Sequence, residues 1–115
     1  MRETGQIDYV EFAVGETLES TQHFYREAFG WGFQSYGPTY AGFENAGLDG
    51  GFQANPAHAA AQPLVILYSD DLEATVDKVK AAGGEISLPI FPFPGGRRFH
   101  FRDPAGNELA VWSET

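Results

Sequence analysis

The sequence predicts an α+β fold made of two tandem βαβββ modules, and the prediction rests on chain length and an internal repeat. A chain of 115 residues is long enough for one domain and too short for two of ordinary size. Leu18-Glu19-Ser20-Thr21 recurs as Leu72-Glu73-Ala74-Thr75, and an apolar run precedes each copy. We therefore expect a single domain, with module 1 at about 6–53, a connector at 54–62 and module 2 at about 63–115.

Module 1 follows the order strand, helix and three strands. The apolar run 9–14 predicts the first strand, because alternate positions form a uniform apolar set. Apolar residues at three- and four-residue spacing predict a helix over 18–29, which Gly30 ends. Residues typical of β-structure, separated by turn residues, then predict three strands at 32–36, 40–44 and 48–53.

Module 2 repeats this order. A strand is expected at 64–69, a helix from Asp71 or Leu72 to Ala82, and three strands at 85–90, 97–102 and 108–113. The segments 91–96 and 103–107 separate these strands as turns. The second turn has a structural interpretation, because Gly106 permits unusual backbone angles and Asp103 and Asn107 bond locally to the backbone.

Composition restricts the classes of partner. The chain has 7 basic and 16 acidic residues and a net charge of -9, which argues against an extended phosphate-binding face and hence against nucleic acid. The absence of Cys excludes disulfides, thiolate metal sites and a Cys nucleophile. No apolar run approaches the roughly 20 residues that span a bilayer, so we expect a cytoplasmic protein with no membrane partner. The 10 Phe, 5 Tyr and 2 Trp residues suggest that some rings line a cavity.

Two segments carry a resemblance to a known family. The predicted first helix ends in HFYREAFGW (23–31), and FRDPAGNEL (101–109) leads into the last strand. Together with the tandem modules they resemble the vicinal oxygen chelate superfamily, which groups glyoxalase I, bleomycin-resistance proteins, fosfomycin-resistance enzymes and extradiol dioxygenases. The resemblance implies that the modules form one curved mixed sheet, an incomplete barrel, with a concave cavity between paired modules. It also implies a homodimer.

The resemblance further implies where a metal would bind. Metal-dependent members carry four His or Glu ligands on the first and fourth strands of each module. These positions fall on Tyr9, near 51–53, on Leu64 and on Ala110. Leu and Ala offer no donor atom, and a neutral Tyr or amide is a poor one. We therefore expect no family metal site and no cofactor.

Strand alternation predicts which side chains face the concave side, because successive side chains point to opposite faces of a sheet. The rings assigned to the packed core are Phe12, Phe24, Phe29, Phe99 and Phe101. The polar and aromatic side chains assigned to the concave face are Tyr9, Glu11, Tyr68, Arg98, His100, Glu108 and Trp112. Of these, Glu11 and His100 are the candidate catalytic residues and the other five are candidate ligand-binding residues.

Glu11 is the most informative of these residues, because a carboxylate inside an apolar strand is costly unless it is paired or functional. It is expected to act as a general base or as a hydrogen-bond acceptor for a ligand. Arg98 or His100 would then supply positive charge to an anionic or carbonyl group. The alternative interpretation is an ion pair between Glu11 and Arg98 that satisfies both groups.

The function expected from these features is the binding of a small organic molecule by a homodimer without metal. One alternative is a metal-dependent lyase or isomerase of glyoxalase type, in which acids such as Glu11, Glu44 or Glu108 hold a divalent ion in a shifted register. A second alternative is a non-catalytic, dimeric structural or regulatory protein whose cavity is filled by its own side chains.

Overall fold

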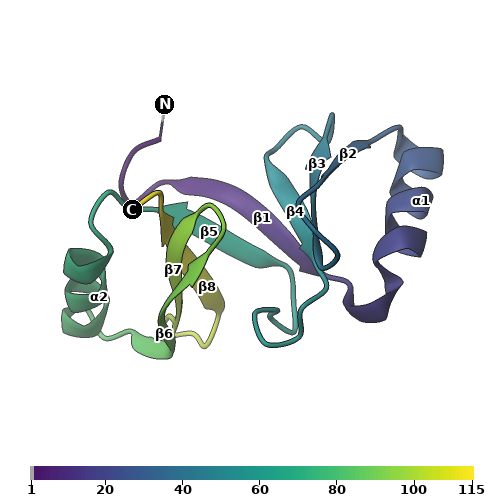
Figure 1. The fold of residues 1–115 in the computed structure, drawn as a ribbon. Helices are drawn as coiled ribbons and strands as arrows, with labels where there is room; N and C mark the ends of the chain where they lie inside the picture. The colour runs from purple at the N-terminus through teal and green to yellow at the C-terminus, as the bar shows by residue number, and fades with distance from the viewer. Residues whose placement is uncertain (1) are drawn as a thin grey trace. The chain divides into compact units, whose positions relative to one another are not determined.

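The computed structural model describes residues 2–115, which divide into two compact units. The first, here called the α1 unit, is Tyr9–Leu64; the second, the α2 unit, combines Val65–Thr115 with the described residues up to Asp8. Each unit has a four-stranded mixed sheet and one α-helix beside it, as Figure 1 shows for α1 and α2. The α+β class and the βαβββ order of each repeat are therefore confirmed.

The α1 unit contains most of the first strand and the four elements that follow it. Its elements are β1 (Ile7–Ala13, which begins in the α2 unit), η1 (Gly15–Thr17), α1 (Leu18–Phe29), β2 (Gly32–Ser35), β3 (Tyr40–Glu44) and β4 (Gly50–Gln53). Within it the strand order is β2-β3-β4-β1, with β1 parallel to β4 and the other pairs antiparallel. Tyr25 of α1 packs on this sheet, with ring centroids 6.4 Å from Phe12 and 5.6 Å from Phe52.

The α2 unit repeats the pattern. Its elements are β5 (Leu64–Tyr68, whose first residue belongs to the α1 unit), α2 (Leu72–Ala81), β6 (Glu85–Phe93), β7 (Gly96–Arg102) and β8 (Glu108–Ser113), in the strand order β5-β8-β7-β6. Asp71 caps α2 by accepting a hydrogen bond from the backbone N–H of Ala74. Leu72 of α2 forms a fully buried core with Phe99 of β7 and Val111 of β8.

The turn before β8 has the structural role that the sequence predicts. The Asp103 side chain accepts hydrogen bonds from the backbone N–H groups of Ala105 and Asn107, and from the Asn107 amide. These bonds, with that of the Asn107 side chain foremost, lower the pKa of the Asp103 carboxyl below its usual range. Gly106 has a φ of 90°, a backbone conformation that favours glycine.

Two of the five rings assigned to the core are exposed, so that part of the prediction is wrong. Phe24 is 55 % exposed and Phe29 is 64 % exposed. Phe24 lies in the middle of α1 and Phe29 is its last residue, and the two rings pack on each other and on Tyr25. Phe12, Phe99 and Phe101 do pack against the sheet cores.

The second difference concerns β6, which continues through the first half of the segment 91–96 predicted as a turn. The strand runs to Phe93, and its pairing with β7 is irregular between Ile86 and Leu88 and again between Leu88 and Phe91. Pro92 is tolerated because β6 ends the strand order of its sheet, where a missing N–H interrupts no second ladder. The extension places Phe91 opposite Arg98.

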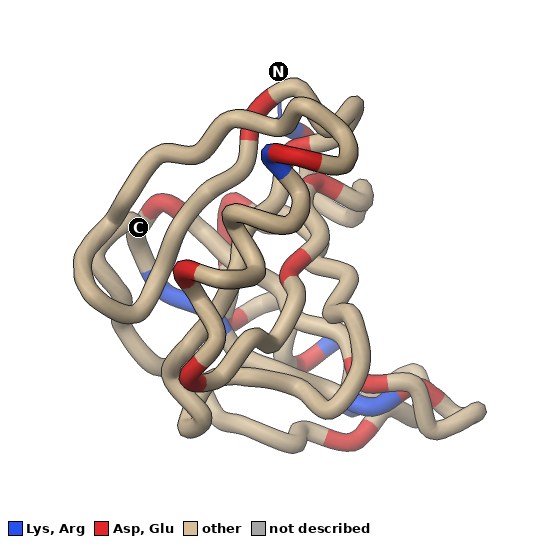
Figure 2. Tube along the Cα trace, turned by 90° about the vertical axis from the view of Figure 1, so that its right-hand side faces the viewer, with Lys and Arg blue, Asp and Glu red and all other residues tan. Residues whose placement is uncertain are grey.

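Acidic residues outnumber basic residues along the whole trace, as Figure 2 shows. Within residues 2–115, no helix is long and apolar enough to cross a membrane.

Candidate functional site

The α1 unit holds a polar cluster, the hydroxyl cluster, made of the buried Glu11 and the partly buried Tyr9 and Tyr40. The alternation predicted for β1 places Tyr9 and Glu11 on one face, while Phe12 packs toward α1 on the other. The Tyr40 hydroxyl lies 2.9 Å from Glu11 Oε1 and 3.0 Å from the Tyr9 hydroxyl. Glu11 is only 2 % exposed, so Tyr40 compensates part of the cost of burying its carboxylate.

The proton of Tyr40 is directed to Glu11. A phenol has one proton, and a carboxylate is a stronger acceptor than a second phenol, so Tyr40 donates to Glu11 and can accept from Tyr9. Burial, followed by the negative charge of Glu11, raises the pKa of Tyr40 well above its usual range. Burial likewise raises the pKa of Tyr9 to about 12. Both phenols therefore stay protonated and available for hydrogen bonding at neutral pH.

Gly51 on β4 makes room for this cluster. A Cβ atom at Gly51 would lie 2.7 Å from both the Tyr9 and Tyr40 hydroxyl oxygens. The resemblance places a metal ligand of the first strand at Tyr9 and one of the fourth strand near 51–53, and neither place carries a His or an acidic side chain. Among residues 2–115, no three His, Asp or Glu side chains are placed to hold a metal ion. These residues do not fit the metal that the family resemblance implies.

The α2 unit holds a second buried polar cluster, the arginine cluster, made of Arg98, His100 and Glu108. Arg98 and His100 are alternate residues of β7, and His100 is completely buried. Arg98 Nη2 lies 3.0 Å and its Nε 3.3 Å from His100 Nε2. On the other side of the ring, His100 Nδ1 lies 3.0 Å from Glu108 Oε2. The imidazole therefore connects the guanidinium to the carboxylate.

These contacts determine the tautomer of His100. Arginine has only N–H donors, so His100 Nε2 must be the unprotonated acceptor. The ring proton then resides on Nδ1 and is donated to Glu108. His100 is thus a neutral imidazole that orients Arg98, while Glu108 in turn orients His100, which suits a positioning role.

Three residues in or near these clusters were not among the predicted site residues. Tyr40 opens β3, where its position suggested only the start of a strand; pairing of β3 with β4 brings its ring to Gly51. The ring centroid of Phe91 lies 5.5 Å from the Arg98 guanidinium carbon. Ser87 donates a 3.3 Å hydrogen bond to Glu108. Alternation along 40–44 could have identified Tyr40, whereas the irregular register of β6 concealed Phe91 and Ser87.

Tyr68 and Trp112, the remaining predicted ligand-binding residues, lie opposite each other on β5 and β8. Their rings meet edge to face, with centroids 5.5 Å apart. The structure thus brings the predicted residues together in three groups: Tyr9 with Glu11, Arg98 with His100 and Glu108, and Tyr68 with Trp112. Pairing of Glu11 with Arg98 stays a prediction, as does ligand binding by all seven residues.

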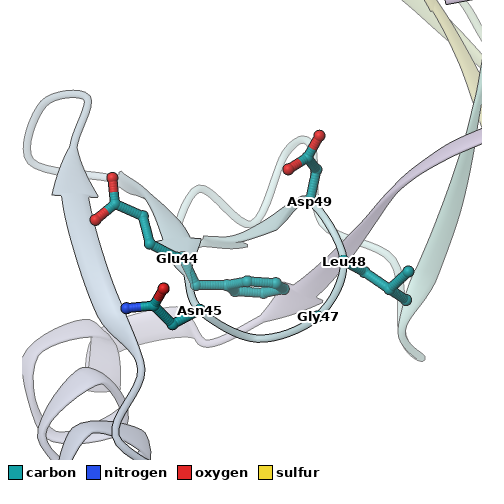
Figure 3. Close-up of a pocket in the computed structure, with 6 residues that line it drawn as sticks. Glu44, Asn45, Gly47, Leu48 and Asp49 are labelled. Atoms are coloured by element: carbon teal, nitrogen blue, oxygen red, sulfur yellow. The ribbon is translucent and has the colours of Figure 1, made fainter.

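Two surface hollows lie in the α1 unit. One, of about 530 Å³, surrounds the loop after β3, and Figure 3 shows the Glu44 and Asp49 carboxylates on the same side of that loop, with Leu48 pointing away from them. The other, of about 350 Å³, lies between β1, α1 and the 61–63 segment. None of the predicted site residues lines either hollow. The hydroxyl cluster and the arginine cluster therefore lie outside these two hollows.

Comparison with known proteins identifies the family. The sequence profile of the Glyoxalase/Bleomycin resistance protein/Dioxygenase superfamily matches residues 6–111. The chain belongs to this superfamily. The resemblance to the vicinal oxygen chelate proteins and the fold class that it implies are thereby confirmed.

The individual relatives of this chain are distant in sequence. It is 30 % identical over 105 residues to proteins named "Putative glyoxylase CFP32" from Mycobacterium bovis and Mycobacterium tuberculosis, a match that covers 81 % of this chain. The chain spans only 40 % of the length of those relatives.

Solved structures share its fold. A superfamily member from Vibrio splendidus has a TM-score of 0.70 at 13 % identity, covering 94 % of this chain and 97 % of that one. The Mn(II)-bound glyoxalase from Novosphingobium aromaticivorans has a TM-score of 0.66 at 21 % identity, covering 99 % of this chain and 40 % of that one.

Proposed function

We propose that this superfamily protein binds a small organic molecule that carries a hydroxyl group, and does so without the family's metal. The observation that carries the proposal is the buried chain from Tyr9 through Tyr40 to Glu11. A buried carboxylate such as that of Glu11 costs free energy in an apolar strand. It is connected through Tyr40 to Tyr9, the position at which the family resemblance implies a metal ligand.

The hydroxyl cluster supports recognition of a donor group. A ligand hydroxyl that donates to Tyr9 extends the chain of hydroxyl groups, with Glu11 as its final acceptor. Glu11 can then accept a proton that passes through Tyr9 and Tyr40, without contacting the ligand itself. This corresponds to the general-base role expected for Glu11 from the sequence. Tyr9 is the group of this cluster that we expect to contact the ligand.

The arginine cluster supports recognition of an acceptor group. His100 and Glu108 hold the guanidinium of Arg98 in one orientation, and a fixed positive charge in a buried environment attracts a carbonyl or anionic oxygen. Considered within the α2 unit alone, Arg98 is therefore a candidate to bind a carbonyl or carboxylate oxygen. His100 and Glu108 would then act by positioning Arg98.

A thermal-shift screen tests the proposal. Small aromatic compounds, antibiotics and α-keto and α-hydroxy acids are added to the wild-type protein and to two variants. We expect at least one compound to raise the Tm of the wild type. Glu11→Gln should weaken that compound's binding about tenfold or more, because a charged hydrogen-bond acceptor is lost. The matched control is Glu44→Gln, an exposed carboxylate of the same unit, which should retain binding. A panel without any stabilising compound, or equal binding by both variants, would contradict the proposal.

The names of the curated relatives favour a second candidate, a metal-dependent lyase or isomerase of glyoxalase type. This alternative requires a divalent ion held by acids such as Glu11, Glu44 or Glu108. Metal analysis of protein purified without chelator separates the two candidates. Stoichiometric zinc, nickel or manganese would establish the metal-dependent alternative and overturn the metal-free proposal.

The homodimer expected from the sequence belongs to the same proposal, as does a cytoplasmic location. Light scattering coupled to size-exclusion chromatography should give twice the 12.6 kDa mass of the chain. A single species of 12.6 kDa at micromolar concentration would contradict the dimer. A dimer that binds none of the screened compounds would instead support the non-catalytic structural or regulatory alternative.

A further inference from the structure

The α2 unit contains a positively charged side chain seated on an aromatic ring. The guanidinium carbon of Arg2 lies 5.0 Å from the centre of the Trp112 ring. Its Nε lies 3.3 Å from Asp8 Oδ2, and the Asp8 side chain is only 17 % exposed. A π-face and a carboxylate on one cation are the two interactions by which proteins most directly recognise positive charge.

The groups that contact Arg2 are held in place by bonds that do not involve Arg2. Trp112 Nε1–H donates a 2.9 Å hydrogen bond to Asp8 Oδ2, which fixes the ring and the carboxylate relative to each other. The Tyr68 ring meets Trp112 edge to face at 5.5 Å, and the Phe93 ring centroid lies 6.2 Å away. We call these four residues, Asp8, Tyr68, Phe93 and Trp112, the tryptophan corner.

Further negative charge surrounds the tryptophan corner. The Tyr68 hydroxyl donates a 3.2 Å hydrogen bond to Glu114, and Asp70 also lies within electrostatic range of that hydroxyl. With Asp8, three carboxylates therefore favour a cation at this place over a neutral molecule or an anion.

Arg2 is brought to the tryptophan corner by its backbone neighbours. Gly5 N–H donates to the Tyr68 carbonyl at 2.8 Å, Tyr68 N–H donates to the Gln6 carbonyl at 3.1 Å, and Asp70 N–H donates to Thr4 Oγ1 at 3.0 Å. These bonds hold the segment that carries Arg2 whether or not its guanidinium is seated. The side chain itself remains 44 % exposed.

We propose that the tryptophan corner is a binding site for a small organic cation of the guanidinium or alkylammonium class, and that Arg2 is its internal, displaceable occupant. The site goes beyond the function proposed above, since that function concerns hydroxyl and carbonyl or carboxylate groups. Arg2 competes with an external cation because the short chain that tethers it keeps its effective concentration high.

The indole N–H of Trp112 is a direct reporter for this site, because it donates to the Asp8 carboxylate that also contacts Arg2. Its ¹H–¹⁵N resonance is followed by NMR, and a Trp31→Phe variant identifies the resonance of the other tryptophan. N-ethylguanidinium chloride is titrated at constant ionic strength into the wild type, Arg2→Gln, and Arg2→Gln combined with Asp8→Asn. N-ethylurea, which has nearly the same shape and no charge, is the control ligand.

In Arg2→Gln we expect a saturable shift of the Trp112 resonance with ethylguanidinium and no saturable shift with ethylurea. The wild type should need about fivefold more ethylguanidinium, because Arg2 must be displaced. Adding Asp8→Asn, which keeps an acceptor for the indole but removes the charge, should weaken binding by at least about fivefold. The proposal is overturned if Arg2→Gln shows no saturable shift, if ethylurea acts equally, if Arg2→Gln and the wild type bind alike, or if Asp8→Asn has no effect.

Discussion

Tyr40 contributes one hydroxyl group to the centre of the hydroxyl cluster. That hydroxyl donates to the buried carboxylate of Glu11 and contacts Tyr9. A group that satisfies a buried charge contributes more to stability than its own hydrogen bond suggests, because its removal leaves the charge with less compensation. At the scale of single residues, Tyr40 is therefore the side chain whose removal should matter most in the α1 unit.

We expect Tyr40→Phe to lower the free energy of unfolding by about 1–3 kcal/mol, the cost of weakening the solvation of a buried charged group. Urea denaturation measures this change. Tyr36→Phe is the matched control, because Tyr36 is 63 % exposed and should lose almost nothing. Equal stability of the two variants would show that the hydroxyl cluster contributes little to the fold.

The raised phenol pKa values predict a loss of stability at high pH. In the unfolded chain Tyr9 and Tyr40 ionise near their usual pKa of about 10, whereas in the folded chain the pKa of Tyr9 is about 12 and that of Tyr40 is also raised. Their contribution is complete below pH 10 and declines above it, and that of Tyr9 is lost as the pH rises through about 12. Urea denaturation across this range should show the decline, and Tyr9→Phe should make it shallower. An identical slope in the variant would argue against the shifted pKa.

His100 accepts from Arg98 and donates to Glu108, and two substitutions separate these roles. His100→Gln can keep an acceptor near the Nε2 position, and His100→Asn can keep a donor near the Nδ1 position. Each should reduce the free energy of unfolding by about 1–3 kcal/mol, because one polar group of the arginine cluster loses a hydrogen bond. In the wild type, NMR of the imidazole nitrogens should show the proton on Nδ1. A proton on Nε2 would refute the positioning role.

At the scale of elements, β4 leaves space for the hydroxyl cluster because Gly51 has no side chain. Gly51 faces Glu11 across the parallel pair of β1 and β4, and any side chain there would enter the space of the two phenols. The close approach of β1, β3 and β4 at this point depends on that glycine.

Gly51→Ala should therefore destabilise the protein by about 1–3 kcal/mol through overpacking. Gly32→Ala is the matched control, because the nearest atom to a new Cβ there is the end of the flexible Glu44 side chain at 3.2 Å. Chemical denaturation compares the two. If Gly32→Ala proved the more damaging substitution, the assigned packing of β4 would be wrong.

The order of elements could be predicted from the sequence because periodicity, helix-ending glycines and the repeat all agree. The face of β1 that carries Tyr9 and Glu11 followed from alternation alone. Alternation failed to predict the course of β6, because irregular pairing shifts its register twice before Phe91. Helical spacing likewise could not show that Phe29, the last residue of α1, is exposed and not part of the core.

For the whole molecule, superfamily membership determines the fold but not the chemistry, since one fold carries many functions. What distinguishes this chain is the set of side chains at the places where the family resemblance implies metal ligands. Leu64 and Ala110 offer no donor atom, and the phenol of Tyr9 and the residues near 51–53 are poor ligands for a divalent ion. The central claim is that this protein recognises its ligand through polar side chains of these clusters and not through a bound metal ion.

Calorimetric titration of the strongest compound from the screen, before and after treatment with EDTA, tests this claim most directly. Metal content is measured on the same samples. The account predicts substoichiometric metal and a Kd that changes by less than about twofold on EDTA treatment, a difference worth about 0.4 kcal/mol. Stoichiometric metal together with binding that EDTA abolishes and added metal restores would contradict it.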